Sequence, residues 1–76
     1  MNNQRRKMLG NIISRIEAVK MDLEAVRDEE QYAYDNMPES LQGGERGQLM
    51  EEAIGYMDEA VESLDEALDD LEEVTW

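Results

Sequence analysis

The chain has 76 residues, a net charge of −13 at pH 7, and neither cysteine nor histidine. Its length allows a single domain over residues 1–76 with a small core, and the absence of Cys and His excludes disulfides, thiolate catalysis and zinc sites built from those ligands, so self-association is the expected reinforcement. No segment has the roughly 20 apolar residues that cross a bilayer, and no signal-peptide core follows the basic start, so we expect a soluble intracellular protein without membrane contact.

Heptad spacing predicts a first helix over about 4–35. Apolar residues recur at alternating intervals of three and four, as one face of a helix requires. The members of this seam are Leu9, Ile12, Ile16, Val19, Leu23 and Val26. Pro38 disfavours helical backbone at the residue before it, and three glycines follow, so the helix should end near Asp35. Residues 36–44 are therefore expected to be a connector, with one helical turn starting at Pro38.

Three consecutive heptads from residue 51 predict a second helix over about 45–74. Each heptad repeats two acids, an alanine and an apolar pair at the same offsets. The seam of this helix is Met50, Ile54, Met57, Val61, Leu64, Leu68 and Leu71. Folding the chain back about Ser40 pairs the two seams in one register, in which the residue numbers of every pair sum to 80. This common register predicts an all-α fold, an antiparallel and coiled-coil-like two-helix hairpin.

Apolar stripes wider than a two-stranded seam predict that hairpins associate. A lone hairpin would leave much of this surface in water. The additional apolar residues are Met8, Ile13, Ala18, Met21 and Ala25 on the first helix and Ala53, Ala60, Ala67 and Val74 on the second. We therefore expect a homodimer that forms a four-helix bundle, or a higher oligomer.

Charge is unevenly distributed along the chain. Residues 1–27 carry six Lys or Arg and three acids, whereas residues 28–76 carry seventeen acids and Arg46 as their one cation. The acidic majority repels phosphate backbones, so we expect no direct nucleic-acid binding. The carboxylate rows are ordinarily a solvated helix face, and the alternative is an imitation of nucleic acid.

The hairpin tip gathers residue types that interfaces favour. Glu30 occupies a seam position opposite Met50, where the pattern calls for an apolar residue. Two interpretations stay open: the carboxylate is solvated or paired with Arg46 near the bundle end, or it belongs to a polar pocket. The candidate partner- or ligand-binding residues are Glu30, Tyr32, Tyr34, Asn36, Met37 and Arg46. In the alternative, Met37 and Leu41 only cap the open end of the bundle.

Catalytic and metal-binding patterns are missing from the chain. It has no His base and no Cys nucleophile, and the glycines at 43–47 lack the strand and Lys of a phosphate-binding loop. The acidic run at 65–73 lacks the glycine turn of a calcium loop, so we predict no enzyme activity, no metal and no cofactor. At the basic end, Arg5, Arg6 and Lys7 are alternative anion contacts, through which an oligomer would bind a nucleotide.

The segment from Asp28 to Gln42, DEEQYAYDNMPESLQ, followed by Glu45, Arg46 and Gly47, resembles small acidic helical-hairpin proteins of bacteriophages and prophages. The resemblance implies a non-enzymatic protein of the bacterial cytoplasm. Such a protein would inhibit a host or bacterial-immunity protein by stoichiometric binding, here through the acidic face and the tip. The alternatives implied are an oligomeric sponge for a nucleotide signal, a DNA mimic, and a purely structural or assembly protein.

Overall fold

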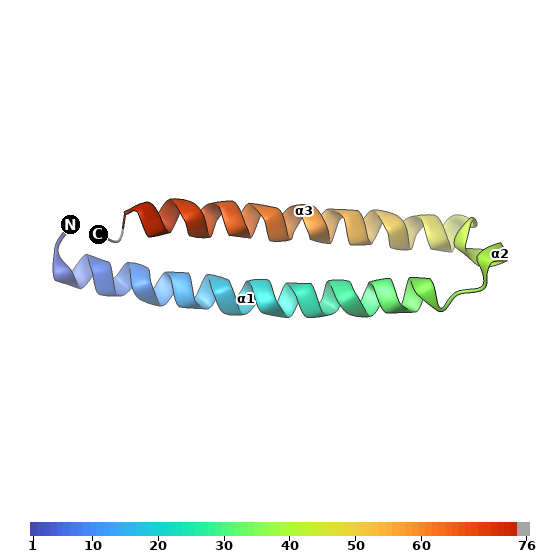
Figure 1. The fold of residues 1–76 in the computed structure, drawn as a ribbon, viewed down its shortest axis with the longest axis horizontal. Helices are drawn as coiled ribbons and strands as arrows, with labels where there is room; N and C mark the ends of the chain where they lie inside the picture. Colours follow the sequence, from blue (N-terminus) through green and yellow to red (C-terminus); the bar gives the residue numbers. More distant parts are fainter. Residues whose placement is uncertain (75–76) are drawn as a thin grey trace.

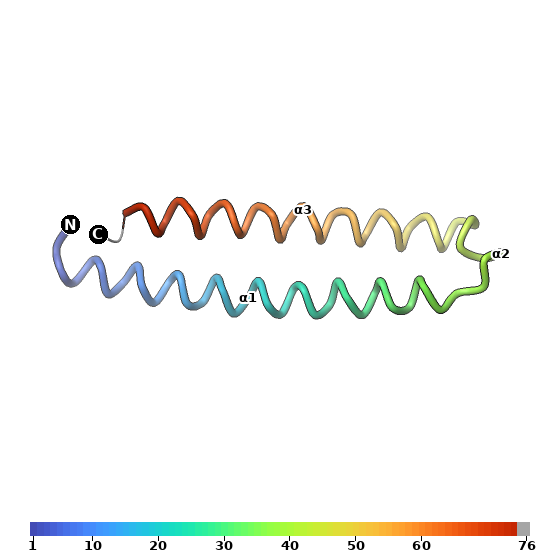
Figure 2. The backbone as a smooth tube through the Cα atoms, in the orientation of Figure 1, coloured from blue at the N-terminus to red at the C-terminus, as the bar shows by residue number. Residues whose placement is uncertain are grey.

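A computed structural model, which describes residues 1–74, shows two long antiparallel helices joined by a short one (Figure 1). Helix α1 spans Asn3–Asp35, α2 spans Glu39–Gln42 and α3 spans Glu45–Glu73. The backbone trace shows α1 and α3 side by side along their length, with the first residues of α1 and the last of α3 at the same end (Figure 2). The all-α hairpin predicted from the heptads is therefore confirmed. Within the described residues, no helix has both the length and the apolar character that crossing a membrane requires.

Local hydrogen bonds set the ends of α1. At its start, the Asn2 side chain accepts a hydrogen bond from the backbone N–H of Arg5 at 2.8 Å, which satisfies one of the free donors of the first turn. At its end, the backbone N–H of Asn36 donates to the carbonyl of Tyr32 at 3.1 Å, and that of Met37 to Tyr34 at 3.0 Å. The helix then stops before Pro38, as the restriction on the residue preceding a proline predicts.

The connector contains the helical turn that the proline predicts. Pro38 is extended and stands as the N-cap of α2, and its carbonyl accepts hydrogen bonds from the backbone N–H groups of Leu41 at 2.8 Å and Gln42 at 3.1 Å. The side-chain amide of Gln42 then donates to the backbone carbonyl of Tyr34 at 2.9 Å. The short helix is thus tied back to the last turn of α1.

Gly47 is buried where α3 leaves the connector. A Cβ atom at this position would lie 2.7 Å from Cα of Gln42, and still closer to its carbonyl group. Because the backbone of α2 occupies the space that a side chain would need, the close approach of α2 and α3 requires glycine. The glycine therefore fixes how the chain enters α3.

The core between the helices is thin. Among residues 1–74, the only buried apolar side chains are Ile54 and Leu68, both on the seam of α3. On α1, two seam residues differ from the expected pairing: Val19 and Val26 are 56% and 54% exposed. The helix is rotated so that the next positions, including Lys20 and Arg27, are half-buried against α3 instead. The physical reason is a set of polar contacts between α1 and α3, described below.

Substitution of Gly47 by alanine should lower the free energy of unfolding by about 1–3 kcal/mol, the usual range for overpacking, because Gln42 cannot move without displacing α2. Gly55 is the matched control, since it lies on exposed α3 surface with nothing near its Cβ position. Gly55→Ala should raise the free energy of unfolding by about 0.5–1 kcal/mol. Urea unfolding followed by circular dichroism at one protein concentration measures both, and equal effects would contradict the close packing.

Candidate functional site

Three polar contacts close one flank of the hairpin. They are spaced seven residues apart on each helix. The ion pairs join Lys20 Nζ to Asp65 Oδ1 at 2.5 Å and Arg27 Nε to Asp58 Oδ1 at 2.8 Å, and the hydroxyl of Tyr34 donates to Glu51 Oε1. We call this side, defined by these six residues, the closed flank.

The direction of helical side chains explains why these residues meet. Side chains lean toward the N-terminus of their own helix, so on antiparallel helices they lean toward one another. Each pair of the closed flank has residue numbers that sum to 85. In the predicted register, residues directly opposite each other have numbers that sum to 80. The offset is about 7 Å along the axis, which the two leaning side chains span together. The contacts therefore agree with the register read from the seams.

The ion pairs shift the pKa values of their cations. The hydrogen bond to Asp65 raises the pKa of Lys20, and the hydrogen bond to Asp58 raises the pKa of Arg27. About half of each aspartate side chain is exposed to solvent, which screens the attraction. The attraction within each pair is consequently modest, and the contacts repeated along the flank together favour one orientation of α1.

At the tip, some of the residues predicted to bind a partner also make contacts within the hairpin. Tyr34 is half-buried and donates its hydroxyl proton to Glu51, while its carbonyl accepts from Gln42 at 2.9 Å. The Asn36 side chain donates to the carbonyl of Tyr32 at 2.7 Å. Met37 is half-buried in the connector. Tyr34 and Asn36 therefore connect parts of the tip to one another.

The other tip candidates are not gathered into one pocket by the described contacts. Tyr32 is 73% exposed and Arg46 is exposed, so both are open to a partner. Glu30 is half-buried, and within residues 1–74 no ion pair joins it to Arg46. The proposed pairing of Glu30 with Arg46 is therefore absent from the described contacts.

The acidic partners of the closed flank were missed when the sequence was considered alone. The sequence places Glu51, Asp58 and Asp65 in the carboxylate rows, for which a solvated face is the ordinary interpretation. The available signal was their seven-residue spacing beside the seam, matched by Lys20 and Arg27 at the same interval on the first helix. Opposite charges repeated at one heptad position of each helix indicate contact across an antiparallel pair.

A second row of acids on α3 faces solvent. Its five glutamates follow one another at seven-residue steps, or about 10 Å along the helix, and all are exposed. They are Glu45, Glu52, Glu59, Glu66 and Glu73, which we call the glutamate row. Over the part of the chain that the structure describes, none of the five forms an ion pair, and no three acids lie close enough together to hold a metal ion.

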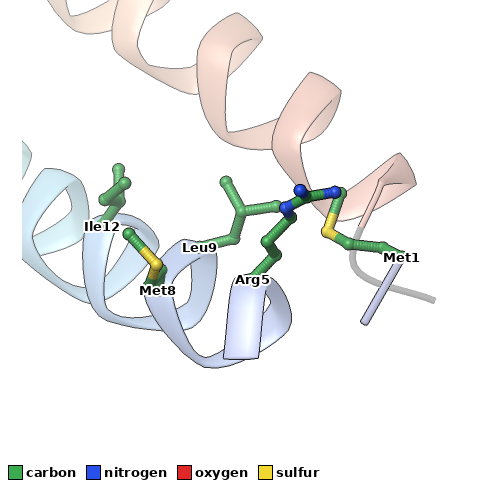
Figure 3. Close-up of a pocket in the computed structure, with 5 residues that line it drawn as sticks. All are labelled: Met1, Arg5, Met8, Leu9 and Ile12. Carbon is green, nitrogen blue, oxygen red and sulfur yellow. The ribbon is translucent and has the colours of Figure 1, made fainter. Parts of the chain in front are cut away.

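On the side away from the closed flank, two apolar grooves follow α1. The first, at the start of the helix, is shown with its lining side chains in Figure 3. Its lining is Met1, Arg5, Met8, Leu9 and Ile12. The second is lined by Ile12, Arg15, Ile16, Val19 and Leu64. Because the grooves share Ile12, they form one continuous surface, which we call the open flank.

The basic residues at the start of α1 have separate surroundings. Arg5 lies in the apolar groove of Figure 3, and Arg6 donates from Nη1 to Asn3 Oδ1 at 3.3 Å. Lys7 is exposed on the helix surface. The described contacts do not bring the three cations to a common anion site.

Comparison of the chain with protein-family models, curated proteins and solved structures found no match. Function is therefore inferred from the surfaces of the hairpin itself. These surfaces are the glutamate row, the exposed residues of the tip and the open flank.

The hydrogen bond to Glu51 raises the pKa of Tyr34, with burial and the carboxylate charge acting in the same direction. Because the folded-state pKa lies above the unfolded value of about 10, the stabilisation is complete below that pH and is lost as the pH rises through the folded-state pKa. The stability difference between wild type and Tyr34→Phe should therefore shrink in strong alkali.

Urea unfolding over a pH series measures this difference, and an ultraviolet titration reports ionisation of the tyrosine directly. Glu51→Gln keeps a hydrogen-bond acceptor but removes the charge, so it should lower the pKa of Tyr34 toward its ordinary value. Tyr34→Phe supplies the background of the other two tyrosines. An unchanged Tyr34 titration in Glu51→Gln would show that the carboxylate does not hold the hydroxyl.

Proposed function

We propose that the protein is a non-enzymatic interaction protein that binds a protein partner stoichiometrically through the glutamate row and the exposed residues of the tip. The observation that carries the proposal is the contrast between two acidic rows on one helix. The closed-flank acids are engaged by groups on α1, whereas the glutamate row is exposed and forms no ion pair within residues 1–74. Its charge is therefore available to a partner.

The geometry of the row favours a basic and elongated partner surface. From Glu45 to Glu73 it extends about 40 Å along a rigid helix. Helix α3 carries twelve acids and one cation, so its potential is negative along its whole length. Complementary charge of this kind speeds association and selects among partners. The resemblance to phage proteins suggests a host or bacterial-immunity protein as that partner.

The tip would add apolar anchors to this electrostatic surface. Tyr32 and Leu41 are large apolar or aromatic residues that are exposed in the hairpin. Tyrosine is one of the residue types that contribute most binding energy at interfaces. Arg46, the one cation of α3, is exposed in the first turn of that helix. A partner that covers both the row and the tip would be selected by charge and by shape.

Self-association is part of the proposal. The radius of gyration is 17.3 Å, against about 11 Å for a compact chain of this length. Two buried apolar side chains form a small core for a domain of any size. We infer that pairs of hairpins associate into a four-helix bundle, in which the open flank is buried.

The experiment compares two triple variants with the same change of charge. In the row variant, Glu52, Glu59 and Glu66 become glutamine. In the control variant, the exposed residues Glu17, Glu24 and Glu29 of α1 become glutamine. Tagged proteins capture partners from a bacterial host lysate, and the captured protein is quantified by mass spectrometry. The amount of partner captured by the row variant should be about tenfold lower than that captured by wild type, because the row meets the partner surface. The control variant should capture the same amount as wild type.

Several outcomes would contradict this proposal. Equal losses in the two triple variants would show that net charge acts without a defined surface. Full retention by the row variant would place the interface elsewhere. A retained nucleotide in place of a protein would favour the sponge alternative. The tip is tested separately by Tyr32→Ala combined with Arg46→Ala, which should weaken capture while the helical circular dichroism is unchanged.

A further inference from the structure

Several exposed apolar residues of α1, among them Met8 and Val19, lie on the side of the hairpin that the ion pairs leave open. Val19 lines the second groove together with Leu64 of α3. Leu64 shares its helix face with Ala60 and Ala67, which are four residues before it and three after it. The open flank therefore combines bulky branched residues on α1 with a column of alanines on α3.

We propose that a second copy of the chain covers the open flank, with α1 of each copy packed against α3 of the other around a two-fold axis parallel to the helices. This inference rests on the self-association proposed above and assigns its face and its helix order. Three independent features support it: the area that the hairpin exposes, the sizes of the facing side chains, and the charges of the helices.

The exposed area matches what a dimer interface would remove. The hairpin exposes 5874 Å², against about 4800 Å² for a compact monomer of 8.8 kDa. The excess of about 1100 Å² is larger than the roughly 800 Å² that each partner buries in a standard interface. A second copy that buries about 800 Å² on the open flank would lower the area per chain to about 5100 Å², nearer to that of a compact protein.

The side-chain sizes are complementary in the proposed arrangement. Rotation about an axis parallel to the helices leaves the height of each residue along the bundle unchanged. The register within one hairpin therefore also applies between the two copies. Val19 then faces Ala60 of the partner subunit, and Val26 faces Ala53 of the partner subunit, with residue numbers that sum to 79 in both pairs. Large residues opposite small ones let packed helices interdigitate. Alanines at seven-residue spacing also permit a close approach of the helix axes.

The charges decide which helices become neighbours. Helix α3 has twelve acids and one cation, whereas α1 has seven acids and six cations. An arrangement with the two α3 helices adjacent would place their acids side by side. With α1 beside α3 of the partner subunit, every strongly acidic helix is flanked only by helices that carry cations. The dimer consequently has antiparallel neighbours throughout.

The first test places a charge on each side of α1. Val19→Glu puts a carboxylate on the open flank, and Met21→Glu puts one on solvent-facing surface that is 69% exposed. The two variants have the same net charge and differ in position by two residues. Sedimentation equilibrium should give twice 8.8 kDa for wild type and for Met21→Glu, and half of that mass for Val19→Glu. Circular dichroism checks that the variants are helical.

The outcomes separate the face from self-association itself. A monomeric wild type would overturn both the proposed self-association and the proposed interface on the open flank. A wild-type dimer that persists in Val19→Glu would overturn the face, while self-association through another surface would stand. Because the hairpin can lose structure when its partner is lost, a second test uses cross-linking of folded protein.

The second test uses the absence of cysteine from the chain. Copies with Val19→Cys and copies with Ala60→Cys are mixed, re-equilibrated and oxidised, and the disulfide-linked species are identified by mass. The proposed helix order predicts mostly mixed dimers of one Val19→Cys copy with one Ala60→Cys copy, because a disulfide requires Cα atoms within about 7 Å. Predominant Val19→Cys homodimers would place the two α1 helices together and overturn the order.

Discussion

The rotation of α1 about its own axis determines which surfaces of this protein are free, and the cross-helix contacts of the closed flank set that rotation. Lys20 and Arg27 reach across to Asp65 and Asp58, and the side of α1 that carries them is drawn against α3. A seven-residue repeat keeps the same side in contact along the whole helix. Because a helix has only one side toward its partner, Val19 is left on the open flank.

The same contacts distinguish two rows of acids on α3. Asp65 and Asp58 beside the seam pair with cations, and Glu51 accepts a hydrogen bond from the Tyr34 hydroxyl. The carboxylates of the glutamate row lie further around the helix, beyond the reach of α1. A strongly acidic chain can therefore pack two helices together with cations opposite two of the aspartates at their junction. The five carboxylates of the glutamate row lie together on one outer face.

Sequence patterns predicted the two helices, their register and the turn at Pro38, because each depends on local spacing or on a backbone restriction. They did not predict the rotation of α1, since a wide apolar stripe shows which half of a helix is buried but not where a single partner sits on it. The Tyr34 contact with Glu51 and the packing of Gly47 against Gln42 depend on how the connector folds, which no periodicity describes.

Self-association and partner binding would use different sides of α3, so the two proposals are compatible. Alanines face the open flank, and the glutamate row lies on the outer surface. In a two-fold bundle with α1 against α3 of the partner subunit, the two α3 helices are diagonal, and their glutamate rows point in opposite directions. Each dimer would then present two equal acidic faces. One partner would then bind to each chain, and a single partner groove would not hold both rows at once.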